Sequence, residues 1–158
     1  MRVYIDTSVF GGYFDEEFQE ASRKFFSTIF KTNDVVLISD TLIGELVKAP
    51  EKVQDLLDRV MQTNSERIGL SEEVYHLRDA YLEEGVLSKK WSDDALHVAH
   101  ATLADADVII SWNFKHLLNP LRIHQFNEIN IERGYEPVVI MTPSDLNQVW
   151  ENNYENKT

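Results

Sequence analysis

The sequence contains no cysteine, which excludes disulfide bridges, thiolate metal sites and cysteine nucleophiles. The absence of disulfides fits a reducing compartment. No apolar run approaches the length that crosses a bilayer, and Asp6 interrupts the first segment before it could form a signal peptide. These absences lead us to expect a cytoplasmic protein without a membrane segment.

Basic residues are also few, because 15 lysines and arginines accompany 27 acids and the net charge is −12. The chain therefore lacks the global basic footprint of a nucleic-acid-binding protein. Carboxylates that hold a divalent cation count as acids in this sum, so a metal-dependent nuclease is not excluded. A polyanionic substrate would need a local basic patch, and the candidates are Lys89, Lys90 and Lys115 with their neighbours Trp91 and His116.

The length of 158 residues and the hydrophobic content of 43% suit a single domain with a substantial core. Short apolar runs are typical of fully buried strands and occur at residues 3–5, 35–38, 108–110 and 138–141. Helical patterns separate these runs, at residues 15–31, 42–47, 50–61, 71–84, 95–103 and 120–134. The alternation predicts a three-layer α/β/α fold with a central, mostly parallel sheet, in one domain over residues 1–158 that ends in a loose tail.

Four oxygen-bearing side chains are expected at the carboxyl edge of this sheet, where ligands bind in open α/β folds. Asp6 and Asn113 follow the first and third strands, whereas Glu45 and Asp94 lie early in helices that start at that edge. Such oxygens are the ligands that Mg²⁺ and Mn²⁺ prefer. Simpler interpretations remain open: Asp94 could complement its helix dipole, Glu45 could be solvated, and Asn113 could be a turn residue. Asp6 is harder to explain in this way, because acids are depleted from strands.

Histidines and tryptophans near these positions have both functional and structural interpretations. His97 follows Asp94 by nearly one helical turn, but packing in the core is the favoured interpretation. His116 lacks the paired spacing of a zinc site. Trp91 and Trp112 could stack on RNA bases, although packing is favoured for both.

The chain resembles a PIN domain, and in particular the small stand-alone VapC-like toxins of prokaryotic toxin–antitoxin pairs. The resemblance rests on the order and spacing of four segments: VYIDTSVF, ISDTLIGELVKAP, SDDALHVAHATLADADVIISWNFKHL and VVIMTPSDL. It implies a PIN-like fold and an endoribonuclease that cleaves RNA phosphodiester bonds with Mg²⁺ or Mn²⁺. It also implies an antitoxin partner and a homodimer.

The resemblance places the first three acids of the family on Asp6, Glu45 and Asp94. It implies that Asp6 and Asp94 hold the principal metal ion and that Glu45 completes the acidic cluster. All three are expected to be catalytic residues.

The fourth acid of the family is replaced in this sequence. The usual threonine-x-aspartate pattern is represented by Ser111 and Asn113, and asparagine offers a neutral carbonyl oxygen in place of a carboxylate. The family hydroxyl next to the first acid falls on Thr7 or Ser8. We expect Asn113 to belong to the catalytic group, and Thr7, Ser8 and Ser111 to orient water or substrate, in a site that is one carboxylate short.

Two other functions remain compatible with the residues. One is a catalytically weakened binding module that acts mainly through a protein partner, as Asn113 and the acidic surface would suit. The other is a phosphate-ester hydrolase, but the second aspartate of that nucleophile motif is Ser8 here.

Overall fold

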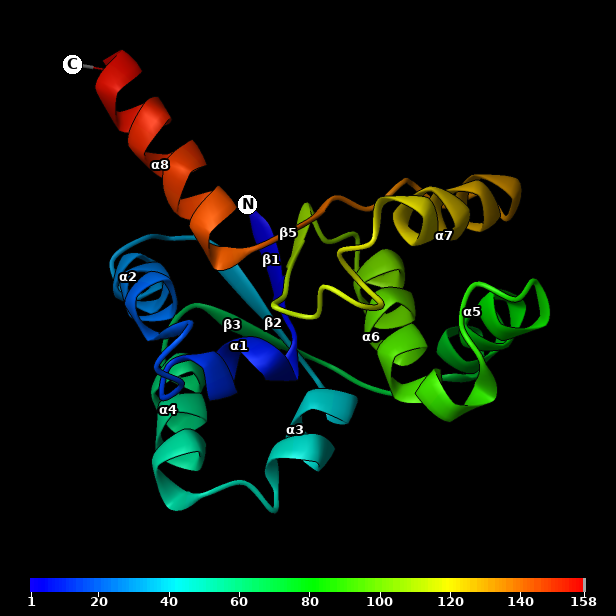
Figure 1. Cartoon of the computed structure of the whole chain (residues 1–158), viewed down its shortest axis with the longest axis horizontal. Helices are drawn as coiled ribbons and strands as arrows, with labels where there is room; N and C mark the ends of the chain where they lie inside the picture. Colours follow the sequence, from blue (N-terminus) through cyan, green and yellow to red (C-terminus); the bar gives the residue numbers. More distant parts are fainter. Residues whose placement is uncertain (158) are drawn as a thin grey trace.

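The computed structural model describes residues 1–157 and consists of a central sheet between two layers of helices (Figure 1). All strand pairs are parallel and the order is β3-β2-β1-β4-β5. The strands are β1 (Arg2–Ile5), β2 (Val35–Ser39), β3 (Ser65–Ile68), β4 (Val108–Ile110) and β5 (Ile140–Met141). The predicted α/β class and parallel sheet are confirmed. Strand β3 was not predicted, because it is a partly exposed edge strand without an apolar run.

The helices confirm most of the predicted pattern. They are α1 (Thr7–Gly12), α2 (Gln19–Ile29), α3 (Asp40–Leu46), α4 (Glu51–Met61), α5 (Glu72–Glu83), α6 (Ser92–Leu103), α7 (Pro120–Glu132) and α8 (Pro143–Lys157), with a short 3₁₀ helix η1 (Lys89–Trp91). Helix α1 was not predicted, and the expected loose tail is instead helical to Lys157. Residue 158 lies outside the described residues. Among residues 1–157, no helix combines the length and the apolar character needed to cross a membrane.

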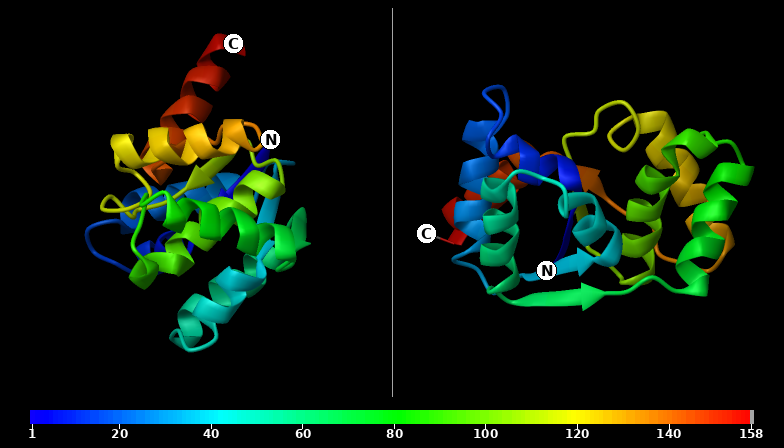
Figure 2. Two further views of the ribbon diagram at one scale, coloured as in Figure 1. Left: turned by 90° about the vertical axis from the view of Figure 1, so that its right-hand side faces the viewer. Right: turned by 90° about the horizontal axis from the view of Figure 1, so that it is seen from below.

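The strands alternate their side chains between two cores, as the pleat of a sheet requires. Tyr4, Leu37 and Ile109 point to one face, where they join the core formed with α5, α6 and α7. Val3 and Val36 point to the other face, toward α1, α2, α4 and α8. Figures 1 and 2 show these two layers on opposite sides of the sheet, with the end of α8 extending away from the body.

Helix starts are fixed by local hydrogen bonds. The hydroxyl of Ser39 accepts from the backbone N–H of Leu42 and caps α3, and Ser71 caps α5 in the same way. Helix α6 begins at Ser92, earlier than the predicted residue 95; η1 leads directly into it, and no side chain caps it.

The strand order creates a topological switch point at β1. The chain pairs β2 on one side of β1 and returns later to place β4 on the other side. The backbone N–H of Asp6 donates to the carbonyl of Ile110 over 3.0 Å, so the pairing continues one step past β1. Asp6 and Ser111 therefore leave the sheet side by side, where ligands bind in folds of this class.

Candidate functional site

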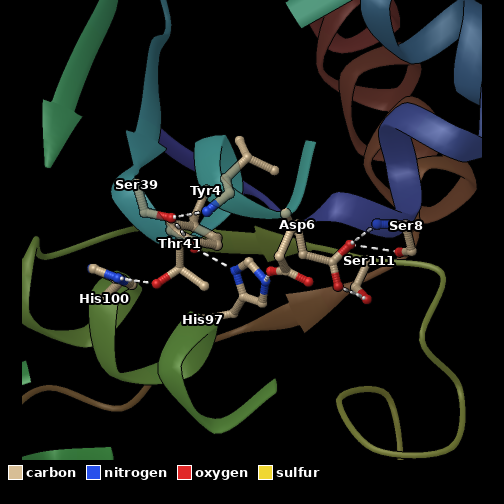
Figure 3. Close-up of polar contacts among 10 residues, drawn as sticks. Tyr4, Asp6, Ser8, Ser39, Thr41, His97, His100 and Ser111 are labelled. Atoms are coloured by element: carbon tan, nitrogen blue, oxygen red, sulfur yellow. Dashed lines mark hydrogen bonds and ion pairs between the residues drawn. The ribbon is translucent and has the colours of Figure 1, made fainter. Parts of the chain in front are cut away.

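Asp6 is buried, with 3% of its surface exposed, and both of its carboxylate oxygens accept hydrogen bonds. Ser8 donates to Oδ1 from its backbone N–H (3.0 Å) and its hydroxyl (2.5 Å), and the Ser111 hydroxyl donates to Oδ2 (2.6 Å) (Figure 3). Burial raises the pKa of Asp6, although the charge of His97 and the two serines oppose the shift. Ser8 and Ser111 thus act on the site through Asp6.

Glu45 and His97 form a partly buried ion pair between α3 and α6. Nε2 of His97 contacts Oε1 of Glu45. Burial lowers the pKa of His97, but the hydrogen bond and charge of Glu45, with the charges of Asp6 and Asp94, outweigh it and the net pKa is raised. Burial likewise raises the pKa of Glu45, but His97 outweighs it and the net pKa is lowered. Both shifts favour the charged pair.

The other ring nitrogen of His97 is held by the sheet. Nδ1 lies 2.5 Å from the hydroxyl of Tyr4, which is 2.7 Å from the hydroxyl of Ser39 (Figure 3). Burial raises the pKa of Tyr4 well above its usual value, so its hydroxyl keeps its proton. The core position predicted for His97 is confirmed, but its contact with Glu45 was not predicted. A usable signal was its position three residues after Asp94 on one helix.

Asp94 is held by a histidine that the sequence did not single out as a contact. Nδ1 of His116 lies 2.7 Å from Oδ2 of Asp94. The backbone N–H of His116 donates to Oδ1 of Asn113 (3.0 Å), and the N–H of Asn113 donates to the hydroxyl of Ser111 (2.9 Å). The amide oxygen of Asn113 therefore stabilises the turn that carries His116, so one loop holds both Asp6 and Asp94.

A groove of about 450 Å³ collects three of the four predicted catalytic residues. Its lining residues are Glu45, Lys90, Trp91, Asp93, Asp94, Asn113, Lys115 and His116. Asp6 does not line the groove, because its side chain is buried. A larger cavity, of about 700 Å³ between α2, α8 and the N-terminus, contains none of these acids. The convergence of carboxylates identifies the smaller groove as the candidate site.

Thr7 supplies an unsatisfied polar atom next to this cluster. Its hydroxyl is buried without a hydrogen-bond partner of normal geometry, and it contributes to the lowering of the pKa of Glu45. A buried oxygen of this kind is available to a water molecule or a ligand.

The donor set fits a hard divalent cation. Glu45 and Asp94 have 32% and 23% of their side chains exposed, and both line the groove. Within the described residues, no three histidine, aspartate or glutamate side chains converge as a ready-made metal cage. Mg²⁺ commonly binds through one or two carboxylates, with water and substrate phosphates completing its shell. Glu45 and Asp94 meet that requirement.

The fold is shared with a solved structure. The crystal structure of VapBC2 from Rickettsia felis bound to a DNA fragment from its promoter contains a chain that matches with a TM-score of 0.54, over 90% of this chain and 98% of that chain. The fold is PIN-like. The identity is 18%, so this similarity shows the fold alone. No protein-family model and no curated protein matches the sequence.

Proposed function

We propose that the protein is a metal-dependent endoribonuclease that cleaves RNA phosphodiester bonds with Mg²⁺ or Mn²⁺. The observation that carries the proposal is the groove in which Glu45 and Asp94 face the same space as Lys90 and Lys115. Carboxylates for a cation next to ammonium groups for an anion suit a phosphodiester substrate. The PIN-like fold and the family motifs support the same chemistry.

The residues of the site have different proposed roles. Glu45 and Asp94 would hold the cation from the groove, and Asp6 would add its charge from the buried side. When bound, the cation activates water and neutralises charge that develops on the phosphate. His97 and His116 fix the orientation of Glu45 and Asp94, and Ser8 and Ser111 fix that of Asp6.

We further propose that the protein is the cytoplasmic toxin of a type II toxin–antitoxin pair, with a protein antitoxin as partner, and that it forms a homodimer. The sequence motifs support this role, and so does the match to a chain of VapBC2. An antitoxin segment placed in the groove would block access to Glu45 and Asp94.

The test is cleavage of a panel of single-stranded RNAs with Mg²⁺ or Mn²⁺. Asp6→Ala and Asp94→Asn should abolish cleavage while circular dichroism shows an intact fold. Asp93→Asn is the matched control, because Asp93 lines the same groove without the contact to His116. Wild-type protein that cleaves no RNA, or a folded Asp94→Asn variant with full activity, would contradict the proposal.

The alternative is a binding module with little catalysis. It is favoured by one observation: within residues 1–157, no three metal-binding side chains are preassembled. Calorimetry with Mn²⁺ separates the two functions. Binding at millimolar metal that is lost in Asp94→Asn supports the nuclease, whereas no binding favours the module.

A further inference from the structure

We propose that Lys90 and Lys115, held over the indole of Trp91, form a phosphate-binding subsite that grips the RNA backbone and does not read its bases. The inference rests on the proposed function, because it names how the substrate is held in that groove. Nζ of Lys90 lies 5.0 Å and Nζ of Lys115 lies 5.3 Å from the centre of the indole ring. Lys90 comes from η1 and Lys115 from the loop after β4, so the tertiary structure assembles the pair.

A second feature of Lys90 and Lys115 is that neither has an acidic partner among the described residues. A minority of the basic residues elsewhere do form ion pairs, such as Arg2 with Glu66 and Lys24 with Glu151. Within the described residues, no carboxylate lies within ion-pair distance of Lys90 or Lys115, although the chain has 27 acids and some line the same groove. Both lysines line the groove, so an anion bound there would meet two ammonium groups that no carboxylate neutralises.

Two of the three acids that line the groove are bonded to histidines. Asp94 is bonded to His116, and Glu45 is bonded to His97. The ring of His116 lies 4.4 Å from that of Trp91, so the indole forms a wall shared by the acidic and basic parts of the groove. A phosphate on the lysines would therefore lie in the same groove as the carboxylates that are proposed to hold the cation.

Trp91 is poorly placed to stack on a base. It is half-buried, both ammonium groups lie over its ring, and the ring of His116 packs against it. Lysine binds phosphate as a point charge and carries no sequence information. The subsite should therefore bind RNA of any base composition equally well.

The experiment measures binding of fluorescein-labelled single-stranded RNA by anisotropy, in EDTA so that no divalent cation is present. We compare wild-type protein with the double variant Lys90→Gln, Lys115→Gln. Lys89→Gln is the matched control, because Lys89 is an exposed neighbour on η1 that does not line the groove. All three are exposed lysines, and melting curves verify folding.

The double variant should bind at least about tenfold more weakly, and its slope of log affinity against log salt should be shallower by about 1.4, since each phosphate contact on a single strand contributes about 0.7. Oligouridylate and oligoadenylate should lose affinity equally, and Lys89→Gln should match wild type within about twofold.

Equal binding by the double variant, a loss confined to one base, or no RNA binding by wild type would overturn the inference. Wild-type binding of poly-glutamate but not RNA would also overturn it and assign the lysines to an acidic protein partner. The two proposals fail separately. If wild-type protein cleaves RNA and the double variant binds RNA as tightly as wild type, only the subsite is refuted. If RNA binding depends on the two lysines but wild-type protein never cleaves RNA, only the nuclease is refuted.

Discussion

The ring of His116 donates from Nδ1 to Oδ2 of Asp94 over 2.7 Å, and this contact joins the loop after β4 to the start of α6. Glu45 is held in the same way by His97, which lies on α6 like Asp94. Glu45 and Asp94 are therefore each oriented by a buried histidine. Partners of this kind commonly change metal affinity or activity by about 10–100-fold when they are removed.

His97→Gln should reduce RNA cleavage by about 10–100-fold, because glutamine cannot bridge Glu45 and Tyr4 as the imidazole does. The Kd for Mn²⁺ should rise together with the loss of cleavage. Calorimetry and single-turnover kinetics measure the two effects. Wild-type metal affinity in a folded His97→Gln variant would show that the histidine does not orient Glu45.

Asn113 is tested by two substitutions that separate charge from turn formation. Asn113→Asp keeps an acceptor for the N–H of His116 and adds a carboxylate to the groove, so Mn²⁺ should bind more tightly and cleavage should increase. Asn113→Ala removes the acceptor, frees His116, and should lower cleavage by about tenfold. Equal activity of the alanine variant and wild type would show that the turn does not hold Asp94.

Gly11 and Gly12 should respond to alanine with opposite signs, although they are neighbours at the end of α1. A Cβ on Gly12 would lie 2.8 Å from the ring of Trp112 and 2.9 Å from the hydroxyl of Ser22, so Gly12→Ala should lower the free energy of unfolding by about 1–3 kcal/mol. A Cβ on Gly11 meets nothing within 4 Å, so Gly11→Ala should raise it, by up to about 1 kcal/mol. Urea unfolding measures both, and a destabilised Gly11→Ala with an unaffected Gly12→Ala would contradict the packing.

His100 should make the stability depend on pH. It is buried, its Nδ1 has no partner, and Nε2 lies 2.9 Å from the hydroxyl of Thr41. Burial and the charge of His97 lower its pKa from 6.5 to about 4. The unfolded chain therefore takes up the proton first as pH falls, and this stabilisation is complete above pH 6.5 and lost as pH falls toward 4.

Between about pH 7.5 and about pH 5, wild type should lose about 2 kcal/mol from this group. The loss should be absent from His100→Gln, in which glutamine can still accept from Thr41. The difference between the two urea-unfolding profiles isolates His100 from the carboxylates that titrate in the same range. Parallel profiles would mean that His100 accepts a proton in the folded state.

Much of the fold is readable from the sequence, because buried strands and amphipathic helices are written in local hydrophobic patterns. The apolar runs ending at Ile5 and Ile110 predicted the central strands. Strand β3 was not predicted, because an exposed edge strand needs no apolar run. Helix α1 was not predicted, because glycine disfavours helices when only the local sequence is considered. In the structure, Gly12 is needed because a side chain there would collide with Trp112.

The sequence alone determined which residue types could form the site: Asp6, Glu45, Asp94 and Asn113, at the carboxyl edge of a parallel sheet. The tertiary structure decided how they are used. It buried Asp6 between two serines and gave Glu45 and Asp94 a histidine each. It also made Asn113 a loop contact and placed two lysines over Trp91. These contacts join residues far apart in the chain, and they exist because β1 lies between β2 and β4, a packing arrangement that no local pattern encodes.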